Sequence, residues 1–426
     1  GGPGGGGAYE RNIGTIPQSD HYDLSDPAEY DILTSLQHDV GRSPTMRMPH
    51  PARADQGPPD RRADGIAAPS PDHLRGRNTI VSLQYLRAVA AIGVVLFHQF
   101  QNIFPAIRFF QHGVDLFFVI SGFIMIALTD GRDIGPRHFY LDRIARIVPP
   151  YWAATALTIL LAAAGIFTPS VTDRSPGHLL ASLLFIPSWG PGGHIWPTLY
   201  LGWTLQYEVF FYLIFGALLM LDSVRRLGVA SILFGMLVIL AAAWPPHTPA
   251  LTIYTSPLLL EFLAGMLLGR LYGIRLNRMP GWWIAGATVA LTAAFLLLIP
   301  FNRDLLFGAG AVFIVSAVLA LERAGYMPQS RTLLELGAAS YAIYLFQQIA
   351  FDITGRMVGQ AAGLAGLPVL TTTLLHPANV LAAIVLGLVM HRYLEKPLTE
   401  QTRIFLNLKP RGASQRMVES NTAGRL

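Results

Sequence analysis

The sequence predicts an all-α, polytopic membrane protein. Of its 426 residues, 52% are hydrophobic and only 13% are charged, against about 25% charged in a typical soluble protein. After about residue 80, apolar runs of about 20 residues recur, the length that crosses a ~30 Å hydrocarbon core. Arginines fall between these runs in an order that fits one orientation in the membrane.

About ten runs are long enough to span the bilayer. They lie at roughly residues 82–103, 113–130, 148–167, 199–220, 228–244, 254–273, 282–300, 304–322, 335–355 and 378–394. The run HLLASLLFIP at 178–187 is too short to cross, so we predict a re-entrant or interfacial segment there. If it crossed, every later basic loop would lie outside, against the positive-inside rule. Both termini are therefore predicted to be cytoplasmic, in the inner (plasma) membrane.

The chain divides into three predicted regions. Residues 1–78 are rich in Gly, Pro, Asp, Arg and Ser and have no core-forming run, which predicts a disordered cytoplasmic tail. The membrane domain covers 79–400, and 401–426 is a cytoplasmic C-terminal tail. No signal-peptide pattern begins the sequence. The absence of cysteine excludes disulfides and thiolate metal sites, and we expect no metal. The net charge of +5 does not indicate a nucleic-acid partner.

The first span, LRAVAAIGVVLFHQF, carries Arg87 and His98. They are eleven positions apart in the sequence, so both project from one helix face about 16 Å apart along the axis. Ionisable groups at this depth are costly and usually face a bundle interior or a wet cavity. Snorkelling of Arg87 to the interface and a structural role for His98 are the alternatives.

The second span adds Asp115 and Ser121. Asp115 enters the membrane about as deep as His98, and a carboxylate beside an imidazole fixes its tautomer and raises its basicity. A helix N-terminal cap is the alternative for Asp115. Ser121 and Gly122 are small enough to let a backbone or a thin ligand approach closely, although small residues also serve helix packing.

Two further sets of polar residues follow. Arg143 and Arg146, one turn apart at the start of the third span, suit the bidentate binding of phosphate oxygens. Lipid head groups are the alternative partner. Glu208 lies deep in the fourth span, on one face with Thr204 and Tyr212, where a carboxylate is rarely without function.

Together these motifs resemble the acyltransferase-3 family of integral membrane O-acyltransferases. The resemblance rests on the Arg-x10-His pair, GVDLFFVISGF, DRIAR, the span with Glu208, SYAIYLFQQ and RYLEKP. The stretch IVSLQYLRAVAAIGVV, at 80–95, is similar to bacterial exopolysaccharide O-acetyltransferases. The resemblance covers about residues 79–400 and implies ten spans and transfer of an acyl group from cytoplasmic acyl-CoA to a glycan. It implies that Arg87 and His98 are the family's essential pair and that Arg143 and Arg146 are its second arginine motif. Gln347 stands where many relatives have histidine, which excludes proton transfer at that position.

The resulting hypothesis is a membrane O-acetyltransferase. His98 acts as general base on an acceptor hydroxyl that attacks the thioester of acetyl-CoA, and Asp115 orients it; Glu208 is a further catalytic candidate. Arg143 and Arg146 would hold the CoA phosphates, with Arg87 and Ser121 along the pantetheine arm. An acetyl-histidine intermediate and a longer acyl donor are left open.

The expected partners are a glycan or lipid-linked sugar as acceptor, and membrane lipid. The segment PSWGPGGHIWPTLY at 187–200, with Trp189, His194, Trp196 and Tyr200, is a candidate acceptor surface, although aromatic residues also line membrane interfaces. A homodimer is left open. A proton-coupled transporter using the same buried groups is the main alternative, but we find no internal repeat of the kind transporters show. A non-catalytic scaffold would leave the aligned ionisable groups unexplained.

Overall fold

The computed structural model describes residues 80–132, 134–166, 173, 175–273, 303–365 and 368–408. Within these ranges every regular element is a helix, which confirms the all-α class. The first half comprises α1 (Val81–Phe100), η4 (Pro105–His112), α2 (Gly113–Thr129), α3 (Pro136–Ala163), α4 (Pro176–Leu183), η5 (Pro191–Gly193), η6 (Tyr200–Gly202), α5 (Trp203–Ala217) and η7 (Leu218–Met220). The second half comprises α6 (Ser223–Ala243), α7 (Pro249–Tyr254), α8 (Leu259–Gly273), α10 (Arg303–Arg323), α11 (Arg331–Ala338), α12 (Ser340–Ala365), α13 (Pro368–Met390), the π-helix η9 (His391–Glu395) and α14 (Lys396–Phe405).

Seven helical segments in the described ranges are long and apolar enough to cross a membrane. They are Val81–Phe100, Pro105–Thr129, Pro136–Ala163, Tyr200–Met220, Ser223–Ala243, Pro249–Tyr272 and Leu375–Phe405. Of the other predicted spans, 282–300 lies outside the described residues, while 304–322 and 335–355 fall on α10 and on α11 with α12, which are not among these seven. The count of ten therefore stays a prediction.

The predicted short segment at 178–187 overlaps α4 (Pro176–Leu183), an eight-residue helix, and continues four residues past its end. At 1.5 Å per residue it is about 12 Å long, too short to cross a bilayer, and its placement at an interface stays a prediction. Both predicted tails lie almost wholly outside the described residues, although α14 continues past the expected boundary at 400 to Phe405.

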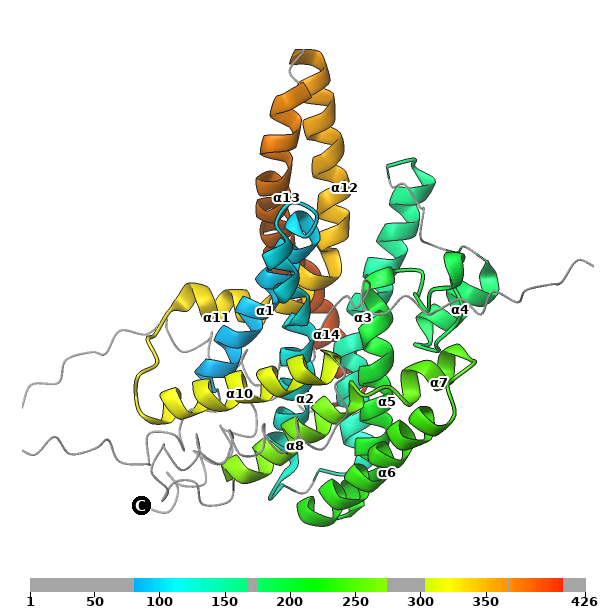
Figure 1. Ribbon diagram of the computed structural model, residues 1–426, viewed down its shortest axis with the longest axis vertical. Helices are drawn as coiled ribbons and strands as arrows, with labels where there is room; N and C mark the ends of the chain where they lie inside the picture. Colours follow the sequence, from blue (N-terminus) through cyan, green and yellow to red (C-terminus); the bar gives the residue numbers. More distant parts are fainter. Residues whose placement is uncertain are drawn as a thin grey trace, which may run out of the picture.

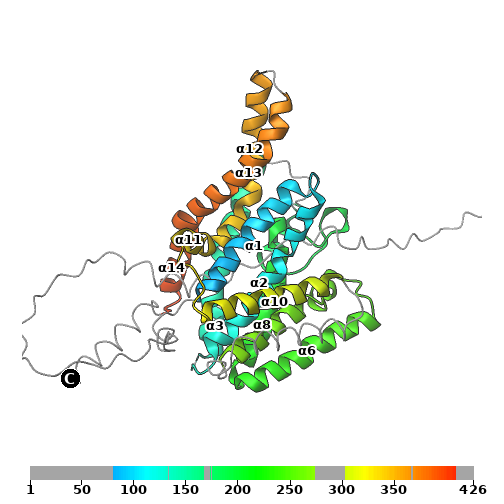
Figure 2. The same cartoon turned by 60° about the vertical axis from the view of Figure 1, so that its left-hand side comes forward.

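Helix α1 lies in the middle of the bundle, where it contacts α2, α10, α11, α12 and α13 (Figures 1 and 2). Its small residues permit this close packing, because Ala88 and Ala91 are fully buried and Gly93 lies against the ring of Phe110. The carboxylate of Glu322, at the end of α10, accepts the backbone N–H groups of Val81 and Ser82 at 2.8 and 2.9 Å. A distant side chain thus caps the first turn of α1.

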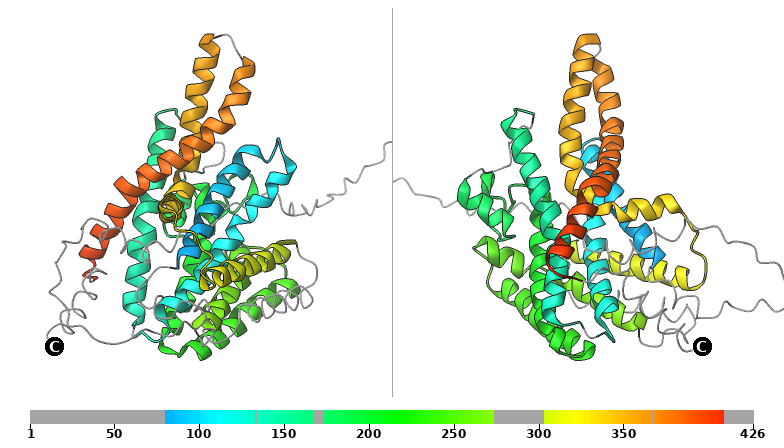
Figure 3. Two further views of the ribbon diagram at one scale, coloured as in Figure 1. Left: turned by 90° about the vertical axis from the view of Figure 1, so that its left-hand side faces the viewer. Right: turned by 180° about the vertical axis from the view of Figure 1, so that it is seen from behind.

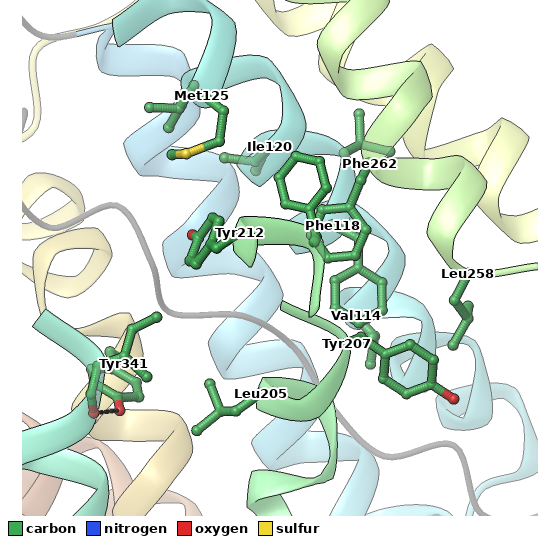
Figure 4. Packing of buried hydrophobic residues seen from close by; sticks show 14 of the residues in the cluster. Val114, Phe118, Ile120, Met125, Leu205, Tyr207, Tyr212, Leu258, Phe262 and Tyr341 are labelled. Carbon is green, nitrogen blue, oxygen red and sulfur yellow. Dashed lines mark hydrogen bonds between the residues drawn. The ribbon is translucent and has the colours of Figure 1, made fainter. Parts of the chain in front are cut away.

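Helices α2 and α8 cross at glycines. A Cβ on Gly122 would lie 2.0 Å from the carbonyl oxygen of Phe262, and one on Gly265 would lie 2.0 Å from that of Val119. This is the small-residue contact that lets membrane helices approach backbone to backbone. The same crossing buries aromatic rings: Figure 4 shows Phe118 beside Phe262, and their ring centroids are 4.6 Å apart.

Helices α12 and α13 form a long hairpin that extends beyond the rest of the bundle (Figures 1 and 2). Gly387 makes the close approach, since a Cβ there would lie 2.5 Å from the Cα of Ile343. From α13 the chain continues through η9 into α14, which packs against α3 (Figure 3).

Candidate active site

His98 lies in the last turn of α1 with its ring partly exposed. The hydroxyl of Tyr200, the first residue of η6, is 3.3 Å from its Nε2 and 3.5 Å from its Nδ1. The two rings meet edge to face, with centroids 6.2 Å apart. Among the seven predicted site residues only His98 is not buried.

Asp115 is bonded to a different histidine from the one we expected. Its Oδ2 is 2.9 Å from Nδ1 of His112, and the imidazole of His112 stacks on the ring of Phe307 at a centroid distance of 3.3 Å. The prediction that Asp115 pairs with His98 is therefore wrong. His112 begins α2 as its N-cap, three residues before Asp115, so the local imidazole takes the carboxylate. Asp115 is not the N-cap itself, but it lies in the first turn of α2, where a carboxylate is favourable.

Arg87 is buried in α1, and its Nη2 donates to Oγ of Ser340 at 2.9 Å. The next residue of α12, Tyr341, donates to the carbonyl oxygen of Ile147 in α3 at 2.9 Å. Tyr341 is also near enough to Arg146 and Glu208 to interact with their charges. The start of α12 therefore links α1 to α3 and brings the two arginine motifs toward one region.

Arg143 and Arg146, which were predicted to hold the CoA phosphates, are both buried. Nη2 of Arg143 donates to Oδ2 of Asp142 at 2.7 Å, and Arg403 of α14 donates to the other oxygen of the same carboxylate. The guanidinium of Arg143 also lies over the ring of Tyr212, 5.6 Å from its centroid. Arg403 was missed because it follows the last apolar run; the signal for it was the charged helix that RYLEKP begins.

Glu208 and Ser121 are both fully buried, and Tyr212 joins them. The hydroxyl of Tyr212 donates to Oε1 of Glu208, one turn earlier in α5, and lies 3.1 Å from Oγ of Ser121 in α2. Figure 4 shows Tyr212 on α5, close to α2. The structure therefore brings together two residues, Glu208 and Ser121, that were predicted separately.

Around η5, the segment 187–200 places three aromatic side chains in sequence. The rings of His194 and Trp196 are stacked, with centroids 4.1 Å apart and planes at 7°. Trp196 meets Tyr200 edge to face at 6.0 Å, and Tyr200 contacts His98. The fourth residue, Trp189, is 52% exposed and has no ring contact among the described residues. We call His194, Trp196 and Tyr200 the aromatic row.

The site has two ends. His98 with the aromatic row lies at the η4 end of α1, whereas Arg87, Arg143 and Arg146 lie toward the end where α1 begins and α2 runs into α3. Because α1 is one continuous helix, about 16 Å of axial rise separates Arg87 from His98. Among the described residues, no group of three or more histidine, aspartate or glutamate side chains is arranged to hold a metal ion.

Comparison with known proteins identifies the class of chemistry. Residues 80–391 match a family described as an acyltransferase domain. The exopolysaccharide production protein ExoZ of Rhizobium meliloti (strain 1021) is 39% identical over 297 residues, which are 68% of this chain and 90% of ExoZ. The peptidoglycan O-acetyltransferase OatA of Listeria monocytogenes is 28% identical over 118 residues, 26% of this chain and 18% of OatA. No solved structure matches. The family match spans most of the chain, which therefore belongs to the acyltransferase-3 family and is a membrane O-acyltransferase.

Proposed function

We propose that this enzyme transfers an acetyl group from acetyl-CoA to a hydroxyl of a cell-surface or exported polysaccharide, or of its lipid-linked precursor. The exposure of His98 and its contact with Tyr200 carry the proposal, because they provide a reachable base held by a neighbouring hydroxyl. The relatives support the acceptor class: one is named for exopolysaccharide production and one for O-acetylation of peptidoglycan.

His98 acts as the general base in this proposal. One ring nitrogen takes the proton of the acceptor hydroxyl while the hydroxyl oxygen attacks the carbonyl carbon of the thioester. The C–O bond forms, the C–S bond breaks, and the imidazolium returns its proton to the leaving thiolate of CoA. The hydroxyl of Tyr200 holds the ring in the orientation that this step needs.

The arginine end fits the charge of CoA. Arg143, Arg146 and Arg403 bring three guanidinium groups from α3 and α14 to one region, and their planar forks suit phosphate oxygens. Phosphates there would compete with Asp142 for Arg143 and Arg403. Arg87, placed between this end and His98, would lie beside the pantetheine arm, and the enzyme would sit in the inner membrane with both termini cytoplasmic.

The test is acetyl transfer by the purified protein in detergent, with labelled acetyl-CoA and release of CoA as a second readout. We expect His98→Ala to lower transfer by about 10²–10⁴-fold while gel filtration and the thermal midpoint stay those of a folded protein. His138→Ala is the matched control, since His138 is exposed near the start of α3.

His112→Ala tests the rival base, because the imidazole bonded to the carboxylate of Asp115 is that of His112. If His112→Ala abolishes transfer and His98→Ala does not, the base is His112. If the wild-type protein releases no CoA with any hydroxyl acceptor, the proposed function itself is wrong.

A further inference from the structure

We propose that the aromatic row is the acceptor subsite, and that it binds an uncharged saccharide unit whose hydroxyl it directs to His98. This inference rests on the proposed function, because it assumes that transfer takes place at His98. It adds the position at which the acceptor binds and the class of sugar that the position favours.

The contacts of the row form one continuous path. His194 stacks on Trp196 at 4.1 Å, Trp196 meets Tyr200 at 6.0 Å, and Tyr200 meets His98 at 6.2 Å. An isolated interfacial tryptophan needs only lipid on one side and water on the other. Membrane anchoring alone therefore does not account for a series of ring contacts that runs from His194 to His98. Trp189, in the same segment, is such an isolated residue, because it is exposed and contacts no other ring in the described part of the chain.

The row is reachable along its whole length. His194, Trp196 and Tyr200 are each partly exposed, as is His98, whereas Thr198 and Leu199 between them are buried. A ligand on the row can therefore contact aromatic surface without unpacking the bundle. Arg87 and Glu208 offer no comparable access in this conformation.

The backbone around the row is fixed, as a binding surface requires. The N–H of Gly190 donates to the carbonyl oxygen of His194 at 2.7 Å, which closes the turn. Gly192 and Gly193 have φ of 75° and 77°, a conformation that side chains other than glycine rarely adopt. The N–H of Thr198 donates to Oγ of Ser182 in α4 at 3.0 Å, and Ser182 is in turn bonded to Tyr151 of α3 at 2.9 Å.

The chemistry of the row favours a neutral sugar. A pyranose presents C–H groups that pack on aromatic faces and hydroxyls that bond to imidazole and phenol groups, the mixture of apolar and polar contacts found in small-ligand sites. Residues 186–203 contain no Asp, Glu, Lys or Arg. The segment itself therefore has no charged side chain to pair with an acidic or amino sugar; the charged residue bonded to it is Asp173, whose carbonyl oxygen accepts from the hydroxyl of Thr198. A lipid chain would use the aromatic surface but not the polar groups.

The experiment measures binding and transfer separately. The probes are neutral gluco- and galacto-oligosaccharides of four to eight units, with oligogalacturonate as the charged comparison. Binding is followed by saturation-transfer NMR on the detergent-solubilised full chain, and kinetics by acetyl transfer. We expect Trp196→Ala to raise the acceptor KM and the dissociation constant by about tenfold, with the KM for acetyl-CoA unchanged. Trp196→Phe keeps an aromatic ring, so it should raise the acceptor KM and the dissociation constant less than Trp196→Ala does.

Trp244→Ala is the control for membrane anchoring, because Trp244 is 75% exposed at the end of α6. If Trp196→Ala behaves like Trp244→Ala, the row is only an interfacial belt. If it raises both KM values alike, the ring supports the fold. Should Trp196→Ala fail to fold, His194→Ala gives the same readouts. Binding of oligogalacturonate alone, or of no probe, overturns the inference. Binding without any transfer by the wild-type protein would instead count against the proposed function.

Discussion

Replacing Tyr200 by phenylalanine isolates the hydroxyl that contacts His98. The ring contacts with Trp196 and His98 remain, and only an oxygen 3.3 Å from Nε2 is lost. A neutral hydrogen bond contributes about 0.5–1.5 kcal/mol net. At about 1.4 kcal/mol per factor of ten, kcat should fall about 2- to 12-fold if the hydroxyl only orients the imidazole.

The assay is kcat at saturating acetyl-CoA and acceptor, with the KM for acetyl-CoA as the internal control. Tyr200→Phe keeps the aromatic surface but removes a phenol that can bond the sugar, so the KM for acetyl-CoA should not change while the acceptor KM should rise. An unchanged kcat would mean that the hydroxyl does not orient His98. A loss of 10²-fold or more, as large as the loss expected for His98→Ala, would refute positioning and make Tyr200 part of the proton transfer.

Three further substitutions test other parts of the structure. Tyr212→Phe leaves the buried carboxylate of Glu208 short of one hydrogen bond, and we expect a loss of about 1–3 kcal/mol in the free energy of unfolding, read as a lower thermal midpoint. Gly265→Ala places a Cβ against the α2 backbone. Overpacking of this kind lowers the free energy of unfolding by about 1–3 kcal/mol, which is again read as a lower thermal midpoint. Arg403→Ala removes one of the two guanidiniums on Asp142 and should raise the KM for acetyl-CoA but not for the acceptor.

Each of these has a matched control in the chain. Tyr254→Phe should leave the thermal midpoint unchanged, since its hydroxyl has no partner in the described part of the chain. Gly235→Ala should raise the free energy of unfolding, whereas Gly265→Ala should lower it. Nothing lies within 4 Å of the Cβ position at Gly235, and alanine favours a helix by about 1 kcal/mol over glycine. Arg331→Ala removes an exposed ion pair and should leave both KM values unchanged. If a substitution and its control change the thermal midpoint or the KM by the same amount, the structural reason given for that substitution is wrong.

The sequence predicted the features that depend on a single helix, namely the helical class and the positions of residues on one helix face. Apolar length and composition identified the helical class, and 100° per residue placed Arg87 and His98 on one face of a helix that the structure shows as continuous. These quantities need no knowledge of how one helix is rotated against another.

The sequence did not predict which side chains meet. Asp115 was matched to His98 by depth alone, and His112, three residues away, takes its carboxylate instead. Tyr200 reaches His98 across 102 residues of sequence, and Ser340 reaches Arg87 across 253. Neither contact has a signal in spacing or periodicity, because each is set by the packing of separate helices.

The burial of the arginine end argues for a function beyond stability. Arg143 and Arg146 are 5% and 2% exposed, and Asp142, which Arg143 and Arg403 share, is 4% exposed. Removing an ion from water costs several kcal/mol, and well-packed apolar residues often replace buried ion pairs at no loss of stability. Apolar packing alone could therefore hold α14 on α3. Guanidinium groups at this place are explained if an anion has to bind there, and an anion that displaces Asp142 would also loosen the bonds between α14 and α3. Donor affinity and the attachment of α14 are then linked, which is why Arg403→Ala should change the KM for acetyl-CoA while leaving the aromatic row and its acceptor unaffected.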